Sequence, residues 1–263
     1  EIKTSTSSMT SVPKPLKFLK PFYEALKVVY EAWHVAHDLK QTMADMLSVL
    51  AMTMSVPGSQ ECLKYKLEGT NVDISSWGHE YVRFLSGEIA EEYNKRLIEN
   101  VEENEVMDDL MYLVDDIVPF QMSHNAEAEA VDLLMEVQQL KKLVDCCVVD
   151  EGNFERVCLY LLRCADFTSD PDDTLEIFNT AYTLYKIQGR LTDALRVALK
   201  IDDSSKVEEL FSDEVGATET MKQQMSFILG CHRSNFECED DDLNELIGNV
   251  KLSEYFVSVA KDL

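Results

Sequence analysis

The sequence predicts an all-α protein, built as an irregular α-solenoid of antiparallel helical hairpins. Nearly every apolar series repeats with a period near 3.6 residues, and alternating, strand-like runs are scarce. The 263 residues also contain only nine Gly and six Pro. Because 46% of the residues are hydrophobic, the chain lies well above the disordered class. We therefore expect it to fold around one or two helical cores.

The clearest helical hairpin lies on either side of residues 119–123. Apolar residues at helical spacing form one stripe before this segment and a second stripe after it. The two stripes are Val106, Leu110, Leu113, Val114 and Ile117, and then Ala126, Ala130, Leu133, Leu134, Val137 and Leu140. Two striped helices on a short connector pack antiparallel, and neither can bury its stripe alone. The hairpin therefore needs neighbouring helices, as in a helical solenoid.

Local signals predict where the two helices of this hairpin end and begin. Pro119 lacks a backbone N–H and disfavours helical geometry at the preceding residue, so the first helix should end there. Ser123 or Asn125 can cap the second helix. Glu127 and Glu129 then fall in its first turn, where the positive end of the helix dipole favours carboxylates.

The segment before this hairpin predicts a lead-in followed by several helices. Residues 1–12 are rich in Ser and Thr and predict a flexible lead-in, and a helical rod should extend from residue 13 to residue 263. Apolar periodicity predicts helices over 19–33, 43–54, 63–67 and 77–97. Gly69 should end the third helix, and Asp73, Ser75 or Ser76 can cap the fourth. The acidic segment 99–105 is a polar link, which allows a weak boundary there.

Further helices follow the central hairpin. Turn residues at 150–153 and 169–173 should separate a helix around 157–162 from the next segment. Residues 181–202 resemble one tetratricopeptide helical hairpin, with small and aromatic residues, a glycine turn and then Ala-Leu pairs. The remaining periodicity predicts helices over 206–211, 221–231, 243–250 and 253–260, with a solvated acidic linker at 237–242.

Charge and cysteine usage restrict the classes of ligand and compartment. The formal net charge of −25 would repel nucleic-acid phosphates and anionic lipids, so we exclude both as primary ligands. Seven cysteines occur without a CxxC pair and predict free thiols in a reducing compartment, the cytosol or the nucleus. No apolar run is long enough to span a membrane and no signal-peptide pattern opens the chain. The chain begins at Glu1 and not at Met, which we interpret as a fragment or a processed chain.

Two histidine groups were considered as metal sites. His79-Glu80 begins like the zinc-peptidase signature H-E-x-x-H, but Arg83 stands where the second histidine is required. His34 and His37 are three residues apart on a predicted helix and could share a metal. No third ligand is spaced to complete that site, so surface or helix-end histidines are the better interpretation. The sequence therefore predicts no metal site.

Acid–base and calcium sites were tested in the same way. His124 with Glu127 and Glu129 could serve as acid–base groups, but residues at a helix N-terminus are the better interpretation. The acidic segment 170–173 does not fit the calcium-loop pattern, because Leu175 stands where Gly is required. No glycine-rich phosphate loop and no G-x-S-x-G motif occurs. We therefore predict no catalytic residue, no cofactor and no enzymatic activity.

A local basic run stands out in this acidic chain. It consists of Lys14, Lys17, Lys20 and Lys27. Such a run could bind an acidic partner, although a solvated face is the better interpretation. These four lysines are the candidate partner-binding residues.

Several segments are more specific than periodicity can explain. They are Met9 to Leu19, Glu61 to Leu67 (Glu-Cys-Leu-Lys-Tyr-Lys-Leu), Ser76 to Arg83 (Ser-Trp-Gly-His-Glu-Tyr-Val-Arg) and His124 to Met135. They resemble the family of the largest non-ATPase subunits in the base of the 26S proteasome regulatory particle. The resemblance runs from Met9 to the C-terminal end and weakens at 35–41, at 99–105 and at 230–233, where the family reads Gly-Arg-His-Gly.

The resemblance implies a non-catalytic scaffold that holds the ATPase ring and supports ATP-dependent degradation of ubiquitinated proteins, in the cytoplasm and nucleus. In the family, ubiquitin, ubiquitin-like shuttle factors and a deubiquitinase bind a later toroid of repeats, and these 263 residues contain no such array. The region before the toroid is implied to pack as a rod against the N-terminal coiled coil of an ATPase pair and to meet other regulatory-particle subunits. A free-standing helical adaptor and a helical hydrolase with a convergent site are the alternatives.

Overall fold

The structure is a computed structural model that describes residues 16–34, 39–70, 73–99, 105–146 and 148–261. Those residues are helices and connecting turns, with no strand among them, so the predicted all-α class is confirmed. Within the same ranges, no helix has both the length and the apolar character needed to cross a bilayer. The chain divides into two compact units, Glu1–Gln139 (unit 1) and Leu140–Leu263 (unit 2).

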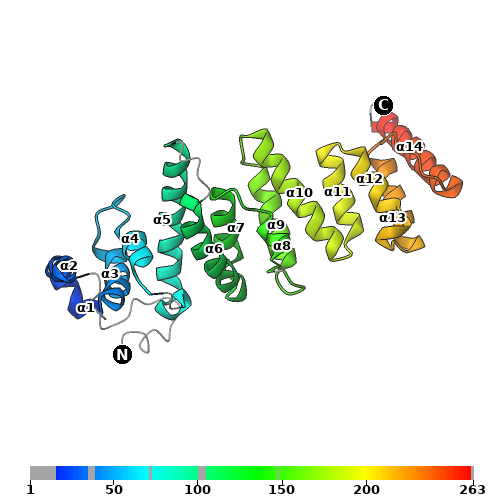
Figure 1. Cartoon of the computed structure of the whole chain (residues 1–263). Helices are drawn as coiled ribbons and strands as arrows, with labels where there is room; N and C mark the ends of the chain where they lie inside the picture. Colours follow the sequence, from blue (N-terminus) through cyan, green and yellow to red (C-terminus); the bar gives the residue numbers. More distant parts are fainter. Residues whose placement is uncertain (1–15, 35–38, 71–72, 100–104, 147, 262–263) are drawn as a thin grey trace. The chain divides into compact units, whose positions relative to one another are not determined.

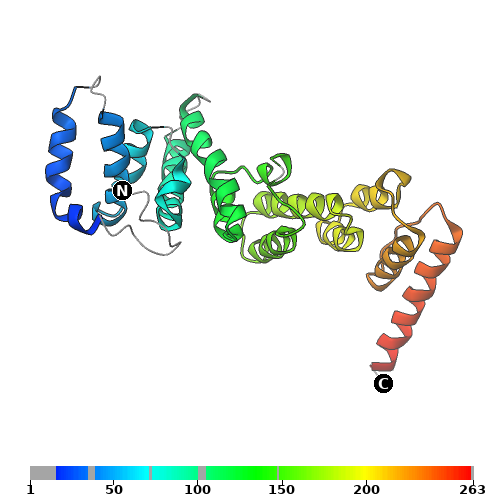
Figure 2. The same ribbon diagram turned by 90° about the horizontal axis from the view of Figure 1, so that it is seen from below.

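Unit 1 is a series of helices in which each packs against its neighbours (Figure 1). Its elements are α1 (Leu16–Leu19), η2 (Lys20–Phe22), α2 (Tyr23–Ala32), α3 (Lys40–Met54), α4 (Glu61–Glu68), η3 (Ile74–Trp77), α5 (His79–Ile98), α6 (Glu105–Ser123) and α7 (Glu127–Glu136). Figure 2 shows α2 beside α3 at one end of the unit. The core contains the fully buried side chains of Leu47, Leu50, Leu85, Ile89 and Leu110.

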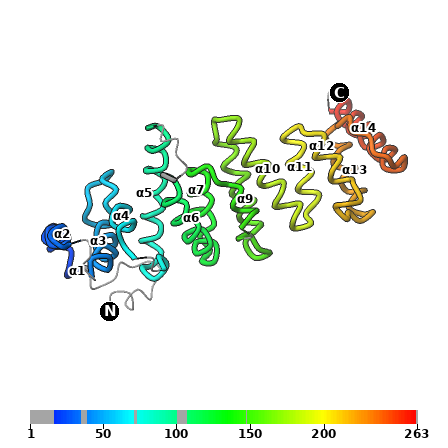
Figure 3. Tube along the Cα trace, viewed as in Figure 1, coloured from blue at the N-terminus to red at the C-terminus, as the bar shows by residue number. Residues whose placement is uncertain are grey.

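Unit 2 continues with antiparallel helical hairpins, as the backbone trace in Figure 3 shows. Its elements are α8 (Lys142–Asp145), α9 (Phe154–Ala165), α10 (Pro171–Ile187), α11 (Leu191–Ile201), α12 (Ser204–Phe211), η4 (Asp213–Val215), α13 (Glu219–Cys231) and α14 (Asp241–Lys261). The tetratricopeptide-like hairpin is present as α10 and α11, and Gly189 supplies the positive φ of 68° between them. Their apolar faces meet α13 in a core that includes Leu195, Met225 and Leu229.

Short polar side chains fix the starts of α10, α12 and α13 in unit 2. Asp170 accepts a hydrogen bond from the N–H of Asp172, and Asp203 accepts from the N–H groups of Ser205 and Lys206. Thr218 does the same for α13. Each cap satisfies N–H groups that have no partner inside the helix. The acidic segment 170–173 that fails the calcium pattern is therefore a helix start.

The central hairpin confirms the predicted apolar stripes but corrects the predicted helix end. Leu110, Leu113, Val114 and Ile117 are buried in α6, and the stripe of the second helix is buried as well. The prediction that Pro119 ends the first helix is wrong, because α6 continues through it to Ser123. Because Pro119 has no N–H, the carbonyl one helical turn before it receives no hydrogen bond from this position. Pro119 is exposed, so this carbonyl lies on the solvent side of the helix, where water can donate instead.

The predicted cap of the second helix is also wrong. The residue at the start of α7 is Ala126, with no side-chain cap, and Ser123 instead donates from its hydroxyl to the carbonyl of Phe120. Asn125 adopts a positive φ of 57°, and the N–H of Ala126 donates to the carbonyl of Gln121. Asn125 therefore helps to end α6, a role its short polar side chain allows. Glu127 and Glu129 do lie in the first turn of α7, as predicted.

Two further predictions concern the boundaries of helices and domains. The helices predicted over 243–250 and 253–260 are one continuous helix, α14, because no Gly or Pro separates them. The predicted lead-in at 1–12 and most of the predicted weak boundary at 99–105 lie outside the described residues. The chain divides into its two compact units between Gln139 and Leu140, and both the weak boundary at 99–105 and the continuity of the rod stay predictions.

The end of α13 generates a stability prediction. The N–H of Ser234 donates to the carbonyl of Leu229, which requires the intervening Arg233 to adopt a positive φ of 57°. A left-handed conformation costs a residue with a β-carbon about 1–2 kcal/mol. Glycine avoids this cost, but its unfolded chain has more conformational entropy, which offsets part of the gain in stability.

We therefore expect Arg233→Gly to raise the free energy of unfolding by roughly 1 kcal/mol in urea denaturation followed by circular dichroism. Arg233→Ala is the matched control, because it removes the same charge and keeps the β-carbon. Equal effects of the two substitutions would show that backbone strain is not the cause.

Candidate interaction surface

The structure separates the four lysines of the basic run. Lys14 lies outside the described residues, Lys17 is exposed on α1, and Lys20 is partly exposed on η2. Within the described ranges neither Lys17 nor Lys20 forms an ion pair. Lys27 differs, because its Nζ lies 2.7 Å from Oε1 of Glu61 on α4. Lys17 and Lys20 can therefore meet a partner, whereas Lys27 holds α2 to its own unit.

Two tyrosine–glutamate contacts complete the attachment of α2. The buried Tyr23 hydroxyl donates to Oε2 of Glu61 at 2.5 Å, and the Tyr30 hydroxyl donates to Glu68. The rings of Tyr30 and Tyr65 meet edge to face, with centroids 5.5 Å apart. Burial, reinforced by the hydrogen bond to Glu61, raises the pKa of Tyr23 above its ordinary value, so the phenol stays a donor.

The opposite side of α2 is apolar and exposed. Val28 is 65% exposed and Phe22 59% exposed, and Val29 is 43% exposed. Ala25 and Ala32 complete this face, and Phe18 on α1 is also exposed. We call these six residues, with Lys17 and Lys20, the α2 face. Helical periodicity correctly predicted a helix here, but it could not show that Phe22 and Val29 point outward.

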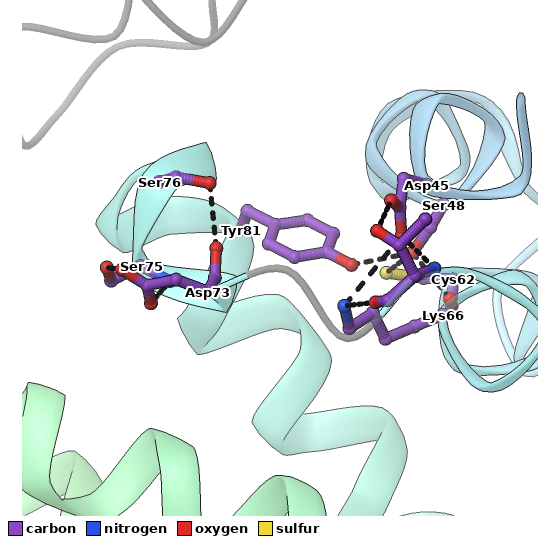
Figure 4. Close-up of polar contacts among 9 residues, drawn as sticks. Asp45, Ser48, Cys62, Lys66, Asp73, Ser75, Ser76 and Tyr81 are labelled. Carbon is purple, nitrogen blue, oxygen red and sulfur yellow. Dashed lines mark hydrogen bonds and ion pairs between the residues drawn. The ribbon is translucent and has the colours of Figure 1, made fainter. Parts of the chain in front are cut away.

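A buried polar network joins α3 to the end of α4 (Figure 4). The side chains of Asp45 and Lys66 are each only 4% exposed and form an ion pair of 3.8 Å. Asp45 also accepts from the N–H of Thr70 at 3.2 Å and from the Thr70 hydroxyl, while Lys66 donates to the Thr70 carbonyl at 2.9 Å. These bonds compensate the desolvation of both charges. A β-carbon at Gly69 would lie 2.3 Å from Oδ1 of Asp45, so only glycine fits there.

A second set of contacts brings in α5, and Figure 4 shows the Tyr81 hydroxyl pointing toward this cluster. Ser48 donates from its hydroxyl to the carbonyl of Cys62 at 2.6 Å, so the Tyr81 hydroxyl, 2.7 Å away, donates to Ser48. Burial raises the pKa of the Cys62 thiol to about 12. Cys62 is therefore an inert core residue and has no nucleophilic thiolate near neutral pH. Together the two sets of contacts join α3, α4 and α5.

The start of α4 is held by a carboxylate from α5. Glu88 is only 8% exposed and accepts from the N–H of Leu63 at 2.7 Å. Burial raises the pKa of this carboxyl, and the backbone hydrogen bonds of Leu63 and Cys62 oppose that rise. Glu88 thus caps a helix that has no capping side chain of its own at Gln60.

The residues considered as catalytic or metal-binding candidates occupy structural positions. His34 is exposed, and His37 lies outside the described residues. His124 packs on the ring of Phe120, with centroids 4.2 Å apart, and its Nδ1 lies 2.8 Å from the Phe120 carbonyl oxygen. Glu127 is buried at the start of α7, at the positive end of the helix dipole. Among the described residues no three ligand-forming side chains converge on a metal position.

Sequence reasoning missed the residues that hold unit 1 together. Asp45 was passed over because it lies inside an apolar stripe, between Ala44 and Met46. A carboxylate in such a stripe is itself a signal, because a buried charge needs a partner. Glu88 gave no comparable signal, since acidic residues are common along the polar face of a long helix.

Comparisons with known proteins agree with one family over the full length of the chain. A family model described as the RPN1 N-terminal domain matches residues 1–263. The 26S proteasome non-ATPase regulatory subunit 2 homolog A of Arabidopsis thaliana is 45% identical over 273 residues, covering 100% of this chain and 29% of the relative. The 26S proteasome regulatory subunit rpn1 of Schizosaccharomyces pombe is 43% identical over 262 residues, covering 100% and 28%. The chain therefore spans less than a third of these relatives.

The attachment of α2 predicts a pH-dependent stability. Burial tends to raise the pKa of Glu61, but the bonds from Lys27 and Tyr23 outweigh it and hold that pKa below 4.5. A lowered carboxyl pKa stabilises the folded state above the unfolded pKa, and this stability is lost as the pH falls through the folded value. We expect Glu61→Gln to lower the free energy of unfolding by about 1–2 kcal/mol at pH 7.

The difference between the Glu61→Gln variant and the original chain should narrow as the pH falls below about 4.5 in urea titrations at several pH values. Glu24→Gln is the control, because Glu24 is 81% exposed and lies 3.7 Å from the same Lys27 Nζ. It should change stability by less than about 0.5 kcal/mol at every pH. A pH-independent effect of Glu61→Gln would contradict the assignment.

Proposed function

The chain belongs to the RPN1 N-terminal domain family, and from this premise we propose that it is a non-catalytic scaffold segment of the 26S proteasome regulatory particle. In that role it supports ATP-dependent degradation of ubiquitinated proteins in the cytoplasm and nucleus. Its relatives are named as regulatory and non-ATPase subunits of the 26S proteasome, which supports this role. Free cysteines at the described positions suit the reducing interior of the cell.

The partner of this segment is the N-terminal coiled coil of a proteasomal ATPase pair, with other regulatory-particle subunits as further neighbours. The observation that carries this proposal is the α2 face, which combines the exposed apolar side chains of Phe22 and Val28 with Lys17 on α1 and Lys20 on η2. An apolar helix face with cations at its N-terminal end suits an acidic amphipathic helix, which packs by its apolar side and pairs its carboxylates with those cations. We assign no ubiquitin or ubiquitin-like shuttle factor to these 263 residues, because the family resemblance implies that both bind a later toroid of repeats.

Two lysines of the original run have different parts in this proposal. Lys14 precedes Lys17 in sequence and adds to the same positive field. Lys27 supports the surface indirectly, because its ion pair with Glu61 keeps α2 in place. Charge reversal at Lys17 and Lys20 therefore tests the contact with the partner, whereas changing Lys27 tests the folding of α2.

The experiment is a calorimetric titration of the 263-residue chain with the paired ATPase N-terminal coiled coil, at low and moderate salt. We expect saturable binding whose affinity falls as the salt concentration rises. Binding should still be measurable at moderate salt, because apolar contacts are not screened. Reversing both charges with Lys17→Glu and Lys20→Glu should weaken binding about tenfold, and Val28→Asp should weaken it by at least as much.

Lys95→Glu on α5 is the matched control, because Lys95 is exposed and carries the same charge in the same unit. It should leave affinity within about twofold of the original chain, a difference of about 0.4 kcal/mol. No binding by a chain that circular dichroism shows to be folded would contradict the proposal. If the α2-face variants and Lys95→Glu change the affinity equally, the α2 face is not the binding surface.

A further inference from the structure

A groove in unit 1 lies beside the contacts described above and shares only Glu88 with the residues named there. It has a volume of about 670 Å³ and lies between α5 and the end of α3 with the turn that follows. Met52 and Pro57 contribute to one wall, and Phe84 and Gly87 to the other. Phe84 is 37% exposed, whereas the adjacent Leu85 on the same helix is fully buried. The size falls in the range of clefts that bind ligands.

The α5 wall has a regular arrangement that follows from helical spacing. Glu80, Phe84, Gly87 and Glu91 occur at i, i+4, i+7 and i+11, so they lie on one face of the helix. The phenyl ring and the glycine are therefore at the centre, with one carboxylate near each end. At 1.5 Å per residue this face is about 16 Å long, which matches about five residues of extended chain.

Gly87 is unusual for its position in the interior of a long helix. Glycine there costs about 1 kcal/mol relative to alanine. No neighbouring atom would lie within 4 Å of a β-carbon at this position, so packing within the described residues does not require glycine. This contrasts with Gly230, where a β-carbon would lie 2.6 Å from Cβ of Val250. Because Gly87 has no side chain, the centre of the α5 wall instead leaves room for another backbone to approach.

The charges around the groove indicate the chemistry of its occupant. Glu80, Glu88 and Glu91 with Arg83 give the lining a formal charge of about −2. Within the described part of the chain, neither Glu80 nor Glu91 forms an ion pair. The two carboxylates are thus available to pair with external cations. The apolar centre of the α5 wall favours aliphatic groups between those cations.

We propose that this groove binds a short basic and apolar peptide segment of a partner protein, with aliphatic side chains against Phe84 and Gly87 and cationic side chains toward Glu80 and Glu91. The occupant is opposite in charge to the acidic helix expected at the α2 face. The proposal goes beyond the scaffold function and does not depend on it.

The test uses the 263-residue chain with ¹³C-labelled methionine methyl groups and nuclear magnetic resonance, because Met52 lines the groove. The probe is a blocked pentapeptide with arginine at each end and leucine, alanine and leucine between. A pentapeptide with glutamate at each end is its charge-reversed counterpart. We expect the arginine peptide to shift the Met52 methyl resonance saturably, and the glutamate peptide to leave it unchanged.

Variants then distinguish the groove from non-specific attraction to an acidic protein. The leucine side chain of Gly87→Leu should fill the space in front of the α5 wall and weaken peptide binding at least tenfold. The double replacement Glu80→Gln with Glu91→Gln should also weaken peptide binding at least tenfold, because it removes both carboxylates. Gly248→Leu in α14 is the matched control, because Gly248 is also a helical glycine with no atom within 4 Å of a β-carbon position. Both leucine variants should stay folded by circular dichroism.

Four results would overturn the proposal. The first is the absence of a saturable Met52 shift with the arginine peptide. The second is an equal response to both peptides. The third is unchanged binding by a folded Gly87→Leu variant. Concentration-dependent self-association that Gly87→Leu abolishes, with no response to peptide, would assign the groove to a second copy of the chain and would also overturn it.

Discussion

The carboxylate of Asp45 is buried inside α3, and the arrangement of unit 1 follows from the need to compensate it. Lys66 and Thr70 supply the ion pair and the hydrogen bonds, and Gly69 leaves room for the carboxylate to reach them. Removing one partner of such a pair leaves an uncompensated buried charge, at a cost of about 3–5 kcal/mol. The contacts therefore fix the end of α4 relative to α3. Glu88 then fixes α5 against α4, and Tyr81 fixes it against α3.

The surfaces proposed for binding depend on this arrangement. The described polar bonds of α2 to the rest of unit 1 run to Glu61 and Glu68 at the two ends of α4, so the orientation of the α2 face follows that of α4. The groove likewise lies between α3 and α5, which meet through Ser48 and Tyr81. In unit 2, Tyr182 and Lys186 of α10 both donate to Glu209 of α12, and Gly230 allows α13 to pack closely against Val250 of α14.

The sequence contained enough information for the fold class, the stripes of the central hairpin and the hairpin at 181–202. Prediction from the sequence failed where packing against a neighbouring element or exposure to solvent determines the local structure. Pro119 was expected to end a helix, but its exposed position lets the helix continue. Periodicity located the helix that carries Phe22 without showing which side would be covered. The groove could not be predicted, because its walls come from segments that only the folded structure brings together.

The central claim is that the buried polar contacts make α3, α4 and α5 one cooperative element that positions both binding surfaces. Hydrogen exchange of backbone amides in the 263-residue chain tests it most directly, with and without Asp45→Asn. The account predicts that the substitution lowers protection in α3, α4, α5 and α2 together and by a similar free energy, while unit 2 is unchanged. Loss of protection confined to the segment around Thr70, with α5 and α2 as protected as before, would contradict it.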